Sequence, residues 1–468
     1  MRSAMVAVSG PGAWRPYVAW FVSLALLFGL AFMVLTPPYQ GADEPNHLYR
    51  AYAISTGVWY PDTTTARRGG QVPESLLAMF DTYQHVRWYA QAKTSFDSLP
   101  QFAALPLAPQ HTRFVDYPNT AVYPWPVYAP ATVGILVART FNFSTLATLR
   151  AARLAGLFTW LAAAAFALWL LPAWRRLFVA LLLLPMVVWT HATVSADTLT
   201  NSVAVVAMAY LLRLAYGSHQ PLRSSHLVGL LLAGVTLATM KLVYVPILLL
   251  AVLIPAKRFT NWGGKWLVAA AVAGLTVATL FYWSHQSQAV YLPYEDYAVE
   301  FREGLDLPSW AHVPRHQAMI VRAPHRLFRA AGNSLSTAGP MFVQGTIGTF
   351  GWLDTYLPIW LVAFGYVYLF ALAAMGWPPS WWHKLAILVG VVACYLLVIF
   401  SQMLSWEPVG THIVGTVQGR YLVPFVPLFF LLFTANWRPA GRRWLLPLGS
   451  LLLLSASTYI IYQRYYVS

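Results

Sequence analysis

The feature that most constrains this chain is a series of long apolar segments that recur along nearly its whole length. The first, residues 17–36, contains no charged side chain. About 20 apolar residues are enough for a helix to cross the hydrocarbon layer of a bilayer. Only 10% of the 468 residues are charged, against about 25% in soluble domains. The sequence therefore predicts an all-α polytopic integral membrane protein.

Eleven segments are candidate transmembrane helices by length and apolar content. Residues 121–141 are not counted among them, because the stretch AVYPWPVYAP is broken by prolines, which cannot continue a helix. There we expect a re-entrant or surface-lying helix instead. The eleven candidates are residues 17–36, 148–172, 177–193, 198–216, 226–241, 243–256, 265–283, 356–374, 385–404, 421–435 and 444–461.

The basic residues at the ends of these segments predict the orientation of the chain. All of them fall on one side if the N-terminus is cytoplasmic and the first span is a signal anchor. The C-terminus is then extracytoplasmic, and a single membrane domain, residues 1–468, carries two large extracytoplasmic loops, 37–147 and 284–355. The basic residues are Arg15, Arg175, Arg176, Arg223, Lys257, Arg258, Lys265, Lys384, Arg438, Arg442 and Arg443.

The distribution of charge excludes some classes of function. In this topology all fifteen acidic residues lie outside, and the thin basic cytoplasmic face has no room for a nucleotide-binding domain. The formal charge of +15 is spread over short clusters between spans. It therefore indicates topology and attraction to anionic membrane lipids, with a possible polyanionic ligand, rather than nucleic acid. The single cysteine, Cys394, excludes an intrachain disulfide.

A charged cluster, GADEPNHLYRA, follows the first span directly. If residues 45–56 are helical, Asp43, His47 and Arg50 fall at positions i, i+4 and i+7 and share one face. Asp43 can then act as a general base, with Arg50 keeping it ionised and His47 orienting it or binding the acceptor. Alternatively, Asp43 caps the helix and Pro45 occupies its first turn. Asp43 and His47 are also a possible, though minimal, pair of ligands for a divalent metal ion.

Two further short motifs carry isolated charges. In SADTLTN, residues 195–201, Asp197 is either a functional acid at the membrane edge or, with Ser195, a cap of the next helix. In MKLVYVP, residues 240–246, Lys241 either extends its ammonium group to the membrane surface or binds a lipid phosphate.

Glycines and aromatic residues accompany the last two motifs. In VQGRYLVP, residues 417–424, Gly419 permits close backbone approach, and Arg420 can present its guanidinium fork to a phosphate. The alternative for Arg420 is an ion pair with Glu407. The stretch GTIGTFGWLDTYLP, residues 345–358, suits a sugar-stacking or lid element and equally an ordinary loop.

The motifs GADEPNHLYRA, SADTLTN, KLVY, GTFGWLD and QGRYLVP, in this order, resemble bacterial membrane proteins of the family called domain of unknown function 2142. The resemblance runs from about residue 20 to 460. That family is similar to the GT-C glycosyltransferases, which place an acidic catalytic residue just after the first span and use a polyprenyl-phosphate-linked sugar donor. The resemblance implies Asp43 as the base and Glu44 as its substitute. GT-C enzymes often separate two acids by one residue, whereas here they are adjacent, so either can be the one that reaches the acceptor.

The expected function is transfer of a sugar from a polyprenyl phosphate to an extracytoplasmic cell-envelope glycan or glycolipid, with inversion of the anomeric carbon, at the bacterial inner membrane. Arg420 and Lys241 would neutralise the donor phosphate. No cofactor is certain, and a divalent metal ion is possible. The expected substrate-binding residues are His47, Arg50, Asp197, Lys241, Tyr244, Gln418, Arg420 and Tyr421.

Two other functions fit the same sequence. An O-antigen-type polymerase or ligase would depend on basic loop residues such as Arg50 or Arg113. A transporter or flippase for lipid-linked sugars would show paired broken helices at the middle of the membrane in two related halves.

Overall fold

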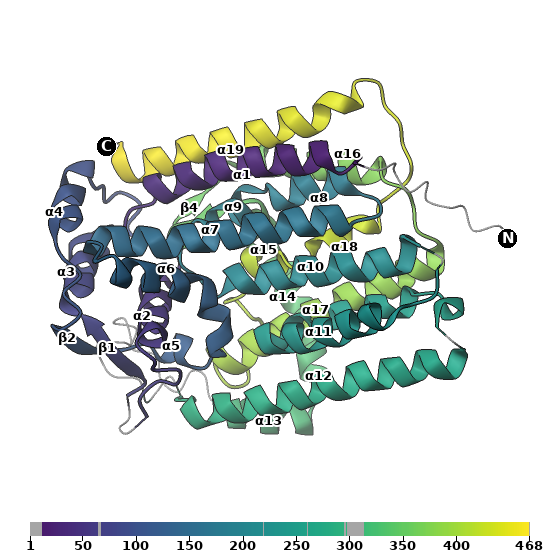
Figure 1. Cartoon of the computed structure of the whole chain (residues 1–468), viewed down its shortest axis with the longest axis horizontal. Helices are drawn as coiled ribbons and strands as arrows, with labels where there is room; N and C mark the ends of the chain where they lie inside the picture. The colour runs from purple at the N-terminus through teal and green to yellow at the C-terminus, as the bar shows by residue number, and fades with distance from the viewer. Residues whose placement is uncertain are drawn as a thin grey trace.

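The computed structural model describes residues 12–63, 67–218, 220–259, 261–293, 296 and 313–467. Long helices run side by side along the longest axis of the molecule, and a group of short helices and strands gathers at one end (Figure 1). The helix α1 (Arg15–Leu35) begins at the opposite end and leads into this group. It ends before Pro37 and Pro38, which cannot continue a helix.

Six helices in the described part of the chain are long and apolar enough to cross a membrane. They coincide with the predicted spans that begin at residues 17, 148, 198, 265, 385 and 444, and they confirm a mostly helical architecture. They are α1, α7 (Thr145–Leu170), α10 (Asp197–Tyr216), α12 (Trp262–Val290), α17 (Trp381–Trp406) and α19 (Arg442–Tyr466).

The other five predicted spans are shorter or interrupted, so the prediction of eleven continuous spans is not confirmed. The shorter three are α11 (Ser224–Met240), the 3₁₀ helix η4 (Leu242–Leu253) and α16 (Ile359–Ala374), and η5 (Ala256–Arg258) follows η4. Prolines occur in most of these segments, and a proline inside a continuous helix could not donate the helical hydrogen bond. The interrupted two are α8 (Arg175–Leu182) with α9 (Pro185–His191), and η8 (Gly419–Leu422) with α18 (Val426–Leu431).

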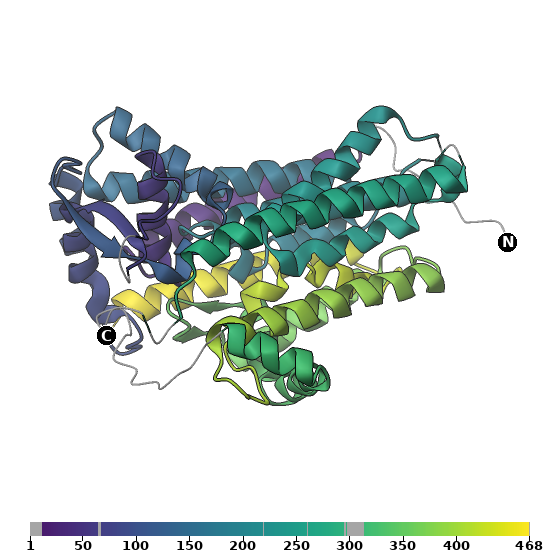
Figure 2. The ribbon, with the colours of Figure 1, turned by 90° about the horizontal axis from the view of Figure 1, so that it is seen from below.

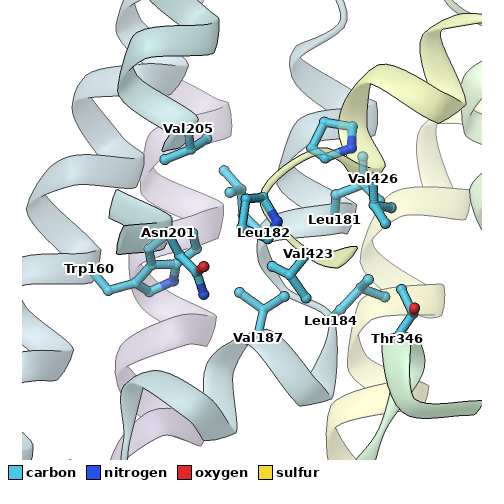
Figure 3. A pocket seen from close by; sticks show the side chains of 12 residues that line it. Trp160, Leu181, Leu182, Leu184, Val187, Asn201, Val205, Thr346, Val423 and Val426 are labelled. Atoms are coloured by element: carbon cyan, nitrogen blue, oxygen red, sulfur yellow. The ribbon is translucent and has the colours of Figure 1, made fainter. Parts of the chain in front are cut away.

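The two interrupted segments approach each other inside the bundle. Figure 3 shows a gap between them lined mainly by apolar side chains such as Leu182, Val187 and Val423, with the amide of Asn201 among them. Its volume is about 20 Å³, roughly the space that one water molecule requires. The helical core is thus nearly filled at this point.

The predicted first loop, residues 37–147, is a compact unit whose hydrophobic core, around Leu48, Tyr117 and Ile135, is separate from the main core and also includes residues of α7 and α11. The antiparallel pair β1 (Gly69–Pro73) and β2 (Thr112–Asp116) closes its outer side. The helix expected within residues 121–141 is present as α6, which turns back along α7. The helices of the unit are α2 (Glu44–Ser55), α3 (Glu74–Tyr83), η1 (Gln84–Val86), η2 (Phe96–Ser98), α4 (Leu99–Ala104), α5 (Pro118–Ala121), η3 (Trp125–Tyr128) and α6 (Ala129–Thr140).

The predicted second loop, residues 284–355, also contains regular structure. Its described part forms α13 (Val313–Arg322), α14 (His325–Thr337), α15 (Gly339–Ile347) and the hairpin of β3 (Thr349–Phe350) and β4 (Thr355–Tyr356). Figure 2 shows short helices of this group standing out from the side of the bundle. Four acidic residues expected in this loop, Glu295, Glu300, Glu303 and Asp306, lie outside the described residues.

Candidate functional site

A cavity of about 280 Å³ lies where the first-loop unit meets the ends of the long helices. Its walls come from many parts of the chain: the start of α2, the α5 region, α9, the start of α10, the residue after α11, the segment from α15 to β4, the end of α17, and η8 with the segment before it. Seven of the ten predicted site residues line it, namely Asp43, His47, Asp197, Lys241, Gln418, Arg420 and Tyr421. Folding therefore brings four separate sequence motifs to one place.

Asp43 occupies the position just before α2 in a left-handed backbone conformation, with φ of 58°. Its side chain makes no capping hydrogen bond, so the capping alternative does not describe its carboxylate. Pro45 does stand in the first turn, as predicted. The carboxylate is 35% exposed and faces the cavity, where it is available to a ligand.

Four charged side chains form a chain of contacts along the cavity wall. Asp43 Oδ2 lies 3.2 Å from Arg420 Nη2, and Arg420 Nε lies 3.8 Å from Asp197 Oδ2. Asp197 Oδ1 in turn accepts a 2.6 Å hydrogen bond from Lys241 Nζ. Two acids thus balance two cations, which buried charges require because isolated ones are costly.

These contacts decide between the alternatives for three residues. Lys241 does not extend to the surface, since its ammonium group pairs with Asp197. The Asp197 amide donates to Ser195 Oγ, so Ser195 takes the local role and the Asp197 carboxylate faces the cavity. Arg420 contacts Asp43 and Asp197, whereas Glu407 accepts from Thr416.

His47 lines the same cavity and is held by a 3.0 Å hydrogen bond between its Nδ1 and Tyr128 Oη. Burial lowers the pKa of His47 to about 4, although nearby Asp43 and Asp197 act in the opposite direction. The ring is therefore neutral near pH 7, and it offers a hydrogen bond rather than a positive charge. Among the described residues, no three His, Cys, Asp or Glu side chains are grouped as metal ligands.

Glu44 is fully buried and does not line the cavity. Its two oxygens accept hydrogen bonds from Arg153 Nε and Nη2, at 2.8 and 2.7 Å, and from the amides of Val194 and Gly41. Arg153 also donates to the carbonyls of Met33, Thr36 and Pro37 at the end of α1. Glu44 therefore locks the start of α2 to α7 and α1, and we do not propose it as a base.

Arg50 and Tyr244 also lie away from the cavity, contrary to the expectation of substrate contact. Arg50 is buried, and its Nη2 donates to the Trp59 carbonyl at 2.6 Å. Tyr244 Oη donates to the Tyr421 carbonyl at 3.0 Å, so it supports the cavity wall from behind. It is Arg420, not Arg50, that lies beside Asp43.

The predicted close approach at Gly419 is present. A Cβ atom at Gly419 would lie 2.2 Å from the backbone carbon of Gly345 and 2.3 Å from the amide nitrogen of Thr346. The two backbone segments touch, and this contact sets the position of Arg420. Gly345 belongs to GTIGTFGWLDTYLP, and this stretch forms one wall of the cavity through Gly345, Thr349, Leu353 and Tyr356.

Sequence reasoning predicted Gln418 and Tyr421 but missed other uncharged residues of the site. Asn119, Thr120 and Tyr123 line the cavity from the first-loop unit, and Gln402 and Trp406 line it from α17. The Lys241 ammonium group lies 5.2 Å from the centre of the Tyr123 ring. Tyr123 could have been found from its place in the stretch 121–141, because prolines there predict irregular backbone next to a polar loop.

Comparison with known proteins places the chain in one family. Residues 26–429 match the family of predicted membrane proteins described as DUF2142. No curated protein and no solved structure matches the chain.

Proposed function

The chain belongs to the DUF2142 family of predicted membrane proteins, and within that family we propose for it the activity of a GT-C-like membrane glycosyltransferase. The proposed reaction moves a sugar from a polyprenyl phosphate to a hydroxyl of a cell-envelope glycan or glycolipid. The observation that carries the proposal is a partly exposed carboxylate, Asp43, beside Arg420 in a cavity that Lys241 also lines and whose walls are polar and aromatic.

In this proposal Asp43 is the general base. Its carboxylate takes the proton from the acceptor hydroxyl while that oxygen attacks the anomeric carbon, and the bond from this carbon to the phosphate oxygen breaks. A single carboxylate base with attack opposite the leaving group inverts the anomeric configuration. The 35% exposure of Asp43 leaves it accessible to such a hydroxyl.

Arg420 and Lys241 stabilise the departing lipid phosphate. A guanidinium presents several N–H groups in one plane, so Arg420 can hold a phosphate oxygen while it still contacts Asp197. Preorganised cations that face developing negative charge are an effective means of lowering a barrier. Their pairing with acids explains how two cations persist in the wall before the donor arrives.

The acceptor would lie against the uncharged part of the cavity. Asn119, Thr120 and Gln402 offer hydrogen-bond groups for sugar hydroxyls, and Tyr356 and Trp406 offer apolar ring faces. We place this cavity at the extracytoplasmic side of a bacterial inner membrane, because the basic residues cluster at the opposite ends of the spans.

The test is transfer of radiolabelled sugar from a panel of polyprenyl-phosphate sugars by purified protein in detergent. Asp43→Asn should slow transfer by about 10²–10⁴-fold, the usual contribution of a general base, while donor binding survives. Lys241→Met should weaken donor binding instead. The matched control is Asp81→Asn, because Asp81 is an exposed acid of the same unit that lies away from the cavity. Wild-type protein that consumes no donor, or an Asp43→Asn variant with full activity, would refute the proposal.

A second candidate, a transporter of lipid-linked sugars, is favoured by one observation. The segments α8–α9 and η8–α18 are both interrupted inside the bundle and meet at the small gap of Figure 3, and interrupted helices are characteristic of transporter substrate sites. Proteoliposomes with a fluorescent lipid-linked sugar separate the two candidates. A transporter moves the lipid between leaflets without cleaving it and tolerates Asp43→Asn.

A further inference from the structure

The helices α13 and α14 form a short hairpin beside α17, with one face attached to the protein and another that none of the described residues covers. The attached face packs Met319, Ile320 and Leu327 against the hydrophobic core and adds two hydrogen bonds. Ala331 O accepts a 2.9 Å hydrogen bond from Tyr395 Oη of α17, and Ser334 Oγ accepts one of 2.8 Å from the amide of Val414. Val414 precedes the cavity-lining residues 415–421. The hairpin is therefore anchored next to the cavity wall.

The outer face of the hairpin is apolar and exposed. Phe328 and Leu335 of α14, which are seven residues apart and share a face, are 62% and 59% exposed. Gly332 lies between them on that face and is also exposed. Val321, at the end of α13, is 82% exposed. Large apolar side chains arranged in this way need a nonpolar environment.

Cations adjoin this apolar row. Arg326 and Arg329 of α14 are three residues apart and lie on neighbouring positions of that helix, and Arg322 ends α13 at the turn between the two helices. Arg322 and Arg329 are exposed, and Arg326 is partly exposed. Residues 313–337 contain no acidic residue, so the hairpin supplies no negative charge of its own to pair with these cations.

We propose that α13 and α14 form an interfacial anchor that binds anionic phospholipids of the membrane. An apolar row flanked by arginines is the pattern of a helix that lies at the boundary between headgroups and acyl chains. Phe328, Leu335 and Val321 contact acyl chains, and Arg322, Arg326 and Arg329 contact headgroup phosphates. Anionic phospholipids are the occupant because the charge of the face is positive throughout. This inference does not depend on the proposed glycosyltransferase activity.

The test uses the full chain with one fluorescent label. Gly332→Cys is the labelling position, because a Cβ there meets no atom within 4 Å, and the native Cys394 is fully buried. The protein is placed in nanodiscs of phosphatidylcholine with brominated acyl chains, with or without phosphatidylglycerol. Phe281→Cys on the exposed face of α12 is the lipid-facing reference, and Gln91→Cys on the first-loop unit is the water-facing one.

We expect bromine to quench the label at position 332 as it does at 281, and not at 91. Phosphatidylglycerol should strengthen this quenching. The triple variant Arg322→Gln, Arg326→Gln, Arg329→Gln should lose this strengthening, because each cation near an anionic surface contributes about a factor of five in affinity. The corresponding triple Arg→Lys variant keeps the charge and should behave like wild type, which excludes misfolding as the cause.

Three results would overturn the proposal. A label at 332 that bromine does not quench places this face in water. Quenching that is equal with and without phosphatidylglycerol removes the role of the arginines. If the label at 332 is shielded from bromine quenching only when a nanodisc holds two copies of the chain, the face binds a second copy rather than lipid.

Discussion

The substitution Glu44→Gln tests whether the buried Glu44–Arg153 ion pair holds the start of α2, and with it Asp43, in place. The carboxylate accepts four hydrogen bonds, two from Arg153 and two from backbone amides, and neither side chain of the pair is more than 2% exposed. A glutamine amide keeps one acceptor oxygen and turns an NH₂ group toward donors. The Arg153 guanidinium then stays buried without a counter-charge.

The expected loss is about 3–5 kcal/mol of unfolding free energy, the usual cost of removing one partner of a buried ion pair. The assay is titration of the protein in mixed micelles with a denaturing detergent, followed by tryptophan fluorescence. Asp81→Asn, at an exposed acid of the same unit, should change the unfolding free energy by no more than about 0.5 kcal/mol.

The double variant Glu44→Leu, Arg153→Met adds a second measurement. It removes both charges, which by itself can be neutral in stability. It also leaves the Val194 and Gly41 amides and the three carbonyls at the end of α1 without these partners, at about 1–3 kcal/mol for each buried group. The double variant should therefore not recover wild-type stability. If Glu44→Gln is as stable as wild type, the Glu44–Arg153 ion pair does not stabilise the start of α2.

Three shorter predictions follow from the site. Gly419→Ala should destabilise the protein and displace Arg420, because the added Cβ would overlap the backbone at Gly345. Gly415→Ala should leave stability unchanged, because no atom lies within 4 Å of a Cβ at that position. Thermal unfolding of both variants measures the difference. The free energy of unfolding should fall as the pH drops from about 6.5 to about 4, because His47 binds a proton in the unfolded state in this range but stays neutral in the folded state. The variant His47→Asn should make the free energy of unfolding less dependent on pH in this range. Arg113→Gln, on the exposed side of β2, should leave sugar transfer within about twofold of wild type, since surface changes away from a site have small effects; complete loss would favour the polymerase.

The sequence was most informative where charge interrupts apolar segments. Asp43, Asp197, Lys241 and Arg420 each stood out because charged residues are costly near a bilayer, and the structure places all four in one cavity. Their partners were not predictable, because pairing between residues 43 and 420 depends on how the helices pack. The same limit applies to Glu44 and Asp43, which are neighbours in sequence but face a buried arginine and a cavity, respectively.

Apolar length was a less complete guide to the helices. It located six long helices, but it also treated residues 177–193 and 421–435 as continuous spans. The breaks at Leu183–Leu184 and Val423–Phe425 lie within apolar runs, and hydropathy does not register the missing amide of the adjacent prolines, Pro185 and Pro424. Aromatic cavity residues such as Tyr123 and Trp406 could not be singled out from the sequence, because aromatic residues are common throughout this chain.

The spread of the charged network along the sequence has a consequence for biosynthesis. A ribosome makes Asp43 early, Asp197 and Lys241 near the middle, and Arg420 only when most of the chain exists. Because Arg420 joins Asp43 to Asp197, a nascent or truncated chain that stops before residue 420 has no completed cavity. The protein thus acquires its cavity in the last steps of translation, and fragments released earlier hold membrane helices without this charged network.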